Sequence, residues 1–166
     1  MRLGLGIGAN DAESVLRSLP SVALRYRAHD RAARQLAQWL ASRPEVGQLL
    51  HPAFEGSPGH ANWKSLCTGG DAGVEGLAAG LFSVVFDARF SASRVDAFCD
   101  ALRLFKLGYS WGGPMSLAVP YDVASMRTPR LATWQHQGVL VRFSIGLEAV
   151  ADLRADLEQA LGVLAA

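Results

Sequence analysis

One arginine interrupts a strongly apolar segment near the end of the chain. Residues 139–145 read VLVRFSI, and Arg142 stands in the middle of them. Because residues of a strand alternate between the two faces of a sheet, Val141 and Phe143 would face one way and Arg142 the other. A planar guanidinium can bind a carboxylate through two parallel hydrogen bonds. Arg142 is therefore a candidate for binding a substrate carboxylate, and a solvated or ion-paired arginine is the alternative.

A second candidate is a run of hydrogen-bonding side chains next to two glycines. Tyr109, Ser110 and Trp111 carry two hydroxyls and an indole N–H, and Gly112 and Gly113 follow them directly. Glycines allow the backbone to approach a ligand closely. This segment could form the lip of an anion pocket. An ordinary turn with an aromatic anchor is the other interpretation.

Other chemistry has weaker support in the sequence. Glycines at positions 4, 6 and 8 have the spacing of a phosphate loop, but too few residues precede them to form the strand that such a loop follows. His51, His60 and Cys67 do not have the spacing of a zinc site. Cys99 lies on an apolar helical face and is expected in the core. We therefore expect no metal site.

The hydrophobic periodicity predicts which elements position these residues. Helices are predicted at 10–19, 21–42, 60–66, 93–102 and 149–161, and strands at 46–50, 81–86, 116–119 and 139–145. Pro20 should break the first helical stretch, and Pro120 should end the third strand. Residues 53–80 are glycine-rich and should be mostly loop around the short helix, and residues 122–138 should be a loop with one helical turn.

This order of elements predicts an α+β fold. Helices should pack on one face of a mostly antiparallel sheet of about four to five strands, and the other face should carry Arg142 and Ser144. Residues 1–42 would be a helical lead-in and residues 43–166 the α+β domain, within a single domain overall.

Composition excludes several classes of protein. The chain has 166 residues, half of them apolar, and a formal net charge of +1. Disorder does not fit so apolar a chain, and nucleic-acid binding does not fit so balanced a charge. No apolar stretch is long enough for a membrane span, and the start lacks a secretory pattern. With two cysteines giving no disulfide framework, we expect a cytoplasmic protein.

Several stretches together resemble the Cys/Met-metabolism enzymes that use pyridoxal phosphate, over nearly the whole chain. The matching stretches are 107–113 (LGYSWGG) with Ser116-Leu117, 140–148 (LVRFSIGLE) with Asp152-Leu153 and Asp156-Leu157, 37–52 around Trp39 and His51-Pro52, and Gly59-His60 with Trp63-Lys64. The Tyr-Ser-Trp-Gly-Gly form is similar to the cystathionine β-lyase branch of that family rather than to its γ-synthase or γ-lyase branches.

The resemblance implies a fold and a role for each candidate residue. In the family this region is the small C-terminal α+β domain of an aminotransferase-like enzyme of fold type I. The arginine of its last strand binds the substrate α-carboxylate, and this role carries over to Arg142. The Ser-Trp pair lines the same pocket, so Ser110 and Trp111 become substrate-binding candidates, with Tyr109 beside them. The implied reaction is β-elimination from cystathionine, giving homocysteine, pyruvate and ammonia.

The resemblance also implies what this chain does not carry. The family's large domain, with its Schiff-base lysine, corresponds to sequence upstream of the matched region. The two lysines here, Lys64 and Lys106, fall elsewhere in the pattern. We therefore expect no catalytic residue in this chain, no binding of pyridoxal phosphate by it alone, and no activity without the missing large domain.

Three alternatives stay open at this point. Met115 stands where the family usually has Glu, so the chain could come from another sulfur-amino-acid lyase or synthase of the family. It could also be a non-catalytic module that binds amino-acid carboxylates. Finally, it could be an oligomerisation module, because removing a large domain should uncover apolar surface. A homo-oligomer is expected, with neither nucleic acid nor membrane as a partner.

Overall fold

The computed structural model describes residues 6–68, 76–126, 134 and 136–165. Its elements in chain order are α1 (Ala9–Ser18), η1 (Leu19–Ser21), α2 (Val22–Ala41), β1 (Val46–Leu50), α3 (His60–Cys67), β2 (Leu81–Phe86), α4 (Ala92–Ala101), β3 (Lys106–Leu107), β4 (Leu117–Tyr121), α5 (Val123–Met126), β5 (Leu140–Ser144) and α6 (Val150–Ala165). Parts of the two predicted loops, at 69–75 and 127–133, lie outside the described residues, as does Gly4 of the glycine spacing.

The described strands form one sheet in the order β1-β2-β5-β4-β3. Neighbours pair antiparallel except β3 and β4, which are parallel. This confirms the predicted α+β fold with a mostly antiparallel sheet. The strand that carries Arg142, β5, is the central one, and its register places Arg142 between Ser83 on β2 and Val119 on β4. The sheet therefore holds Arg142 from both sides.

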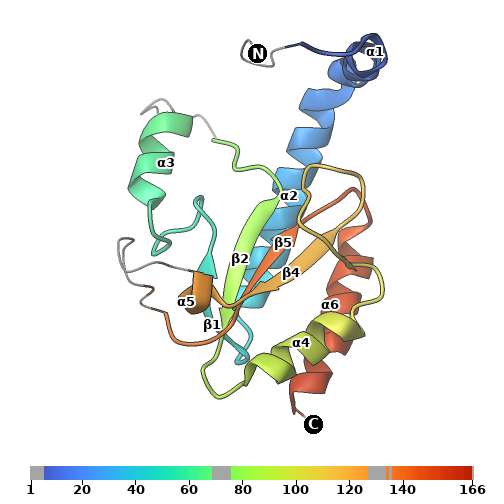
Figure 1. The fold of residues 1–166 in the computed structure, drawn as a ribbon. Coiled ribbons are helices and arrows are strands. Elements are labelled where there is room, and N and C mark those ends of the chain that lie inside the picture. Colours follow the sequence, from blue (N-terminus) through green and yellow to red (C-terminus); the bar gives the residue numbers. More distant parts are fainter. Residues whose placement is uncertain (1–5, 69–75, 127–133, 135, 166) are drawn as a thin grey trace.

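The core lies between one face of the sheet and the helices α2, α4 and α6, which cover that face (Figure 1). Alternate residues of β5 and β2 supply the sheet side of the core, as their apolar spacing predicts. These buried residues are Val141, Phe143 and Ile145 on and after β5, and Phe82, Val84 and Phe86 on β2. Arg142 lies between Val141 and Phe143 along β5, so its side chain is on the opposite face of the sheet. Ser144 shares that register, but it is 2% exposed and therefore buried.

Pro20 divides the N-terminal helical stretch, as predicted. Proline cannot donate a backbone hydrogen bond, and the chain forms the short 3₁₀ turn η1 at this point instead of a continuous α-helix. No residue of α1 is buried, whereas α2 buries a stripe that includes Leu36 and Leu40. The second helix is thus part of the core, and the first contributes nothing to it.

The predicted end of β4 at Pro120 is wrong, because the strand continues to Tyr121. The amides of Lys106 and Gly108 donate to the carbonyls of Ser116 and Ala118, so even-numbered residues of β4 face β3. Pro120 is the next residue facing that way, and β3 ends at Leu107, before it could pair with Pro120. A missing N–H costs little at such an edge position. The sequence also gave no sign of the two-residue β3, and α6 runs four residues beyond its predicted end.

Candidate functional site

Arg142 and the segment that follows β3 lie together on the open face of the sheet. The Nη2 atom of Arg142 donates a hydrogen bond to the carbonyl oxygen of Tyr109, with an N···O distance of 2.8 Å. The guanidinium carbon lies 5.9 Å from the ring centroid of Trp111 and 5.8 Å from that of Tyr121. Both distances are within the range of a cation–π contact. The two candidates that the sequence offered separately therefore form one site.

The guanidinium of Arg142 keeps unused hydrogen-bonding capacity. Its Nε is buried and makes no hydrogen bond in the part of the chain that the structure describes. No carboxylate of the described residues forms an ion pair with this side chain. A buried charged donor without a partner is costly, so such a group in a native fold calls for an explanation. The charge of this guanidinium is thus not balanced by any carboxylate of the described residues.

The side chains beside Arg142 remain accessible from outside. Tyr109 is 70% exposed and Trp111 64% exposed, and Ser110 is exposed as well. The Tyr109 ring contacts the edge of Tyr121, with ring centroids 6.0 Å apart. The backbone of this segment is bound to Arg142, while its hydroxyls and indole stand at the surface. The arrangement offers a cation, two hydroxyls and aromatic faces to a small anionic ligand.

Tyr121 belongs to this site, although it is not among the site residues predicted from the sequence. It lies two residues beyond Val119, the β4 partner of Arg142, and therefore shares its face of the sheet. The sequence feature that indicates Tyr121 is an aromatic residue two positions after Val119, on the same face of the strand. Using that feature requires knowing that β4 continues past Pro120.

A cavity of about 320 Å³ adjoins the site, with Trp111 in its wall. It lies between α2 and the Trp111–Gly112 turn, and His29 and Tyr26 contribute to its wall. His29 is 6% exposed, its Nδ1 donates to the carbonyl oxygen of Ile145 at 2.6 Å, and its Nε2 has no partner among the described residues. The cavity wall is mainly apolar, with Val22, Leu81 and the glycines beside these polar groups.

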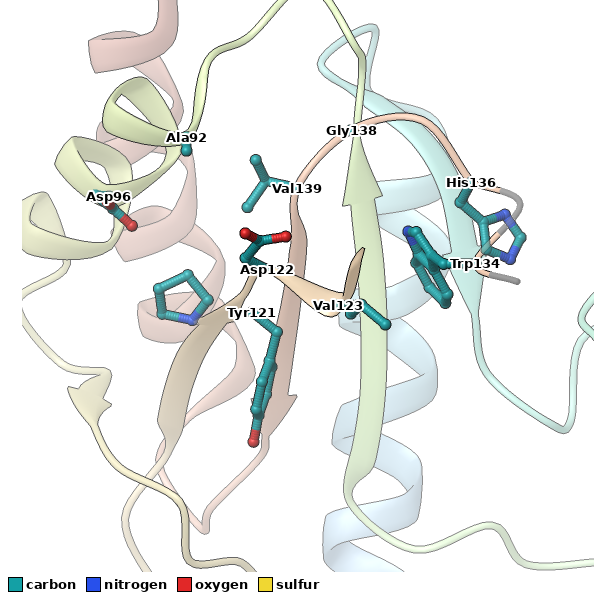
Figure 2. A pocket seen from close by; sticks show the side chains of 10 residues that line it. Ala92, Asp96, Tyr121, Asp122, Val123, Trp134, His136, Gly138 and Val139 are labelled. Atoms are coloured by element: carbon teal, nitrogen blue, oxygen red, sulfur yellow. The ribbon is translucent and has the colours of Figure 1, made fainter. Parts of the chain in front are cut away.

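A second cavity of about 450 Å³ lies at the C-terminal end of β4, with Tyr121 and Asp122 in its wall (Figure 2). Figure 2 shows Asp96 of α4 and Asp122 at its wall, with Tyr121 below them and Trp134 and His136 to one side. The Trp134 and His136 rings contact each other edge to face, with centroids 4.5 Å apart. Two carboxylates give this cavity a negative character, so it does not suit the carboxylate ligand that Arg142 favours.

The remaining histidines and cysteines have structural surroundings. His60 Nδ1 lies 2.8 Å from the carbonyl oxygen of Pro52, and His51 Nδ1 accepts from the amide of Ala53. Over the described ranges, no three His, Cys, Asp or Glu side chains are grouped to hold a metal ion. Burial, with Asp96 and Asp100 nearby, raises the pKa of the Cys99 thiol to about 12. Cys99 is therefore a protonated core residue, as predicted.

No helix in the described part of the chain is both long enough and apolar enough to cross a membrane. The two lysines lie outside the Arg142 site. Lys64 is an exposed residue of α3, and Lys106 Nζ donates to the carbonyl oxygen of Arg103 at 2.6 Å.

This combination defines a small α+β domain that carries one arginine, flanked by aromatic side chains, on the open face of its sheet. The chain belongs to the family of Cys/Met metabolism PLP-dependent enzymes, whose pattern it matches over residues 1–162. It is 39% identical over 163 residues to cystathionine beta-lyase of Bordetella avium, covering 96% of this chain and 37% of that protein. It is 37% identical over 158 residues to cystathionine beta-lyase of Salmonella typhimurium, covering 93% of this chain and 38% of the relative.

A solved structure of another enzyme has the same fold. The O-acetylhomoserine sulfhydrylase of Wolinella succinogenes superposes with a TM-score of 0.76 at 27% identity, over 96% of this chain and 40% of that one. The chain thus spans about two fifths of the length of the relatives it matches. The resemblance inferred from the sequence is confirmed at the level of the family and of the fold.

The family depends on pyridoxal phosphate, and the described residues can be tested against that cofactor. Covalent attachment requires a lysine amine in the site, whereas Lys106 Nζ donates to the carbonyl of Arg103 and Lys64 is an exposed residue of α3. A guanidinium such as that of Arg142 can bind a carboxylate through charge-assisted hydrogen bonds. The described residues therefore fit a ligand carboxylate and do not fit attachment of the cofactor, so no cofactor step is assigned to them.

Proposed function

We propose that this chain supplies the substrate-carboxylate site of a PLP-dependent carbon–sulfur lyase that acts on cystathionine. The observation that carries the proposal is the guanidinium of Arg142 on the open face of the sheet, which lies 5.9 Å from the Trp111 ring centroid and 5.8 Å from that of Tyr121 and forms no ion pair with a carboxylate of the described residues. The similarity to cystathionine beta-lyases over nearly the whole chain supports the choice of substrate.

In this proposal each residue of the site has a defined task. Arg142 binds the α-carboxylate by charge-assisted hydrogen bonds. Trp111 and Tyr121 make cation–π contacts with the guanidinium, which help to fix its position for an approaching carboxylate. The hydroxyls of Ser110 and Tyr109 add donors at the edge of the pocket. A substrate held in this way presents its α-carbon and its sulfur-bearing carbon in a fixed orientation, which lowers the entropic part of the barrier.

The reaction that we propose for the whole enzyme is β-elimination from cystathionine to homocysteine, pyruvate and ammonia. In such enzymes the cofactor serves as the electron sink. The part of the task that falls to this chain is binding and orienting the substrate. We therefore expect this chain alone to be inactive and to form no stable adduct with pyridoxal phosphate. A cytoplasmic location and a homo-oligomeric enzyme are also part of the proposal.

The test is a chimera in which this chain replaces the matching region of the Salmonella typhimurium enzyme. We expect the chimera to cleave cystathionine. The Arg142→Ala chimera should show a strongly raised KM and a lowered kcat, because both affinity and orientation are lost. Arg142→Lys should be intermediate, since it keeps the charge but not the planar fork. Arg27→Ala, which removes an exposed arginine of α2, serves as the matched control.

Two results would overturn the proposal. One is a folded chimera that cleaves another sulfur amino acid but not cystathionine, which would favour a different lyase or synthase of the family. The other is unchanged kinetics in Arg142→Ala. Calorimetry of the chain alone with L-cystathionine separates the binding-module alternative, because half a pocket should give no measurable heat.

A further inference from the structure

The segment between α4 and β4 carries three of the four candidate site residues, and most of it lacks regular structure. It leaves α4 at Leu102 and enters β4 at Leu117, and only Lys106 and Leu107 within it pair with the sheet. Its exposed side chains, Tyr109 and Trp111, can contribute little packing energy to hold it. Phe105 packs in the core against Phe143, and charged side chains of β5, of α6 and of the turn between them bind the backbone of the segment on either side.

The start of the segment is bound by a buried carboxylate of α6. Asp156 is 5% exposed and accepts the backbone amides of three consecutive residues. The distances are 2.8 Å from Arg103 N, 2.8 Å from Leu104 N and 3.2 Å from Phe105 N. A carboxylate that accepts several backbone N–H groups makes strong, directional bonds. The position of residues 103–105 is thus set by α6.

The end of the segment is bound by a second carboxylate, Glu148. Its Oε1 accepts the amide of Ser116 at 2.7 Å, and its Oε2 accepts the hydroxyl of the same residue at 2.8 Å. The Ser116 hydroxyl in turn accepts the amide of Gly146 at 2.8 Å, and the amide of Leu147 donates to the carbonyl oxygen of Pro114 at 2.8 Å. Ser116 is completely buried, so these bonds are protected from water. This network joins the turn after β5 to the residues that follow Gly113.

Arg142 holds the middle of the same segment through the carbonyl of Tyr109. Arg142 and Glu148 are only six residues apart, on β5 and on the turn that follows it. The cation that would bind the ligand and the carboxylate that anchors its neighbours are therefore placed by one short stretch of chain. Displacing the end of the segment at Ser116 would move Ser110 and Trp111 relative to Arg142.

We propose that Glu148, acting through Ser116, is a positioning residue for the carboxylate site, fixing Ser110 and Trp111 over Arg142 without touching the ligand. Asp156 acts as the corresponding anchor at the start of the segment. The consequence for substrate binding rests on the function proposed above, whereas the anchoring itself does not.

The test measures the order of the segment in the complete 166-residue chain by ¹⁵N relaxation. In the parent, we expect order parameters for residues 110–113 near about 0.85, as for a rigid backbone. Glu148→Ala should lower them to about 0.6 or below, while β2 and β5 keep their values. Glu148→Gln should be intermediate and also covers the case in which the alanine variant folds poorly, because an amide oxygen can still accept the Ser116 amide. Glu158→Gln, at an exposed position of α6, should match the parent.

Unchanged order parameters at 110–113 in Glu148→Ala would overturn the proposal. So would an equal loss of order throughout the sheet, since that would indicate a general structural role. In the chimera, Glu148→Gln should raise KM for cystathionine several-fold with a smaller change in kcat. Because relaxation is measured without ligand, loss of order together with an Arg142→Ala chimera of unchanged kinetics would reject the proposed function and leave the anchor intact.

Discussion

The buried imidazole of His51 is held neutral by its surroundings. The side chain is completely buried against the rings of Phe54 and Phe82, and its Nδ1 accepts the amide of Ala53. Burial and the nearby positive charge of Arg34 lower the pKa of His51 from 6.5 to about 4. The negative charge of Asp30 opposes this shift but is the smaller effect. Nδ1 is used as an acceptor, so the proton of the neutral ring lies on Nε2.

This pKa predicts a loss of stability in acid. Above pH 6.5 His51 is neutral in both states, and between pH 6.5 and about 4 only the unfolded chain binds the proton. The contribution of His51 to the free energy of unfolding is therefore fully present above pH 6.5. It decreases by up to about 3 kcal/mol as the pH falls to about 4, and does not change further below that pH. His51→Asn keeps an acceptor for Ala53 N and should remove this component, which urea unfolding of both proteins against pH would reveal. Parallel pH curves would contradict the prediction.

Gly146 is required by close approach of the backbone, not by its own dihedral angles. A Cβ at this position would collide with the carbonyl oxygen of Pro114 and the carboxylate of Glu148. Since one of these atoms is backbone and the other is already hydrogen-bonded, neither can move cheaply. Gly146→Ala should destabilise the chain by about 1–3 kcal/mol.

A matched glycine of α6 should respond in the opposite direction. A Cβ at Gly162 meets nothing within 4 Å. Gly162→Ala should therefore stabilise by about 0.5–1 kcal/mol, because alanine is the better helix former. Denaturant midpoints of the two variants give the comparison. If both substitutions changed the free energy of unfolding in the same direction, the lack of space at Gly146 would not be the deciding factor.

Individual side chains of the site differ in how far the sequence could predict them. Arg142 stands out because one cation interrupts an apolar alternation, and Trp111 because polar aromatics precede two glycines. Their meeting on one face follows the predicted sheet. The partners of Glu148 could not be predicted, because its carboxylate bonds to Ser116, 32 residues away, and local sequence pattern carries no information on so distant a contact.

Elements with a long apolar period were predicted almost completely, and those that depend on a neighbour were not. Strands β2 and β5 and helix α2 carry their own signal over several residues. The strand β3 has two residues, too few for a period, and exists only because β4 lies beside it. The end of β4 is similar, since Pro120 is tolerated only where the neighbouring strand has already stopped.

The hydrogen bonds from the backbone amides of residues 103–105 to Asp156 connect α6 to the segment before β3, and their contribution to stability can be measured. Asp156→Asn replaces one carboxylate oxygen by an NH₂ group, which cannot accept a hydrogen bond, so at least one of the three backbone amides at 103–105 loses its acceptor. Leaving part of this buried set without an acceptor should cost about 1–3 kcal/mol in the free energy of unfolding. Asp152→Asn, exposed in the first turn of the same helix, should cost below about 1 kcal/mol. Similar losses for both would indicate that α6 does not anchor the segment.

At the level of the whole molecule, apolar side chains gather at the end where the first helix leaves the body. In Figure 1, α1 lies beyond the sheet, and none of its residues is buried. The exposed apolar side chains of α1, η1 and the start of α2 are Val15, Leu16, Leu19, Val22 and Leu24. A concentration of exposed apolar residues marks a surface that other protein covers. When the chain is purified alone, a second copy of the chain is the protein that can cover this surface.

We therefore expect the purified chain to self-associate reversibly, with a sedimentation coefficient that rises with protein concentration. The double variant Leu16→Glu, Leu24→Glu should shift the chain toward monomer, because charges replace two side chains that are 67% and 71% exposed. Leu66→Glu is the control, since Leu66 is 82% exposed but lies on α3, away from this end of the molecule (Figure 1). A monomer at every concentration, or equal dissociation in both variants, would mean that the apolar end of α1 and α2 does not drive assembly.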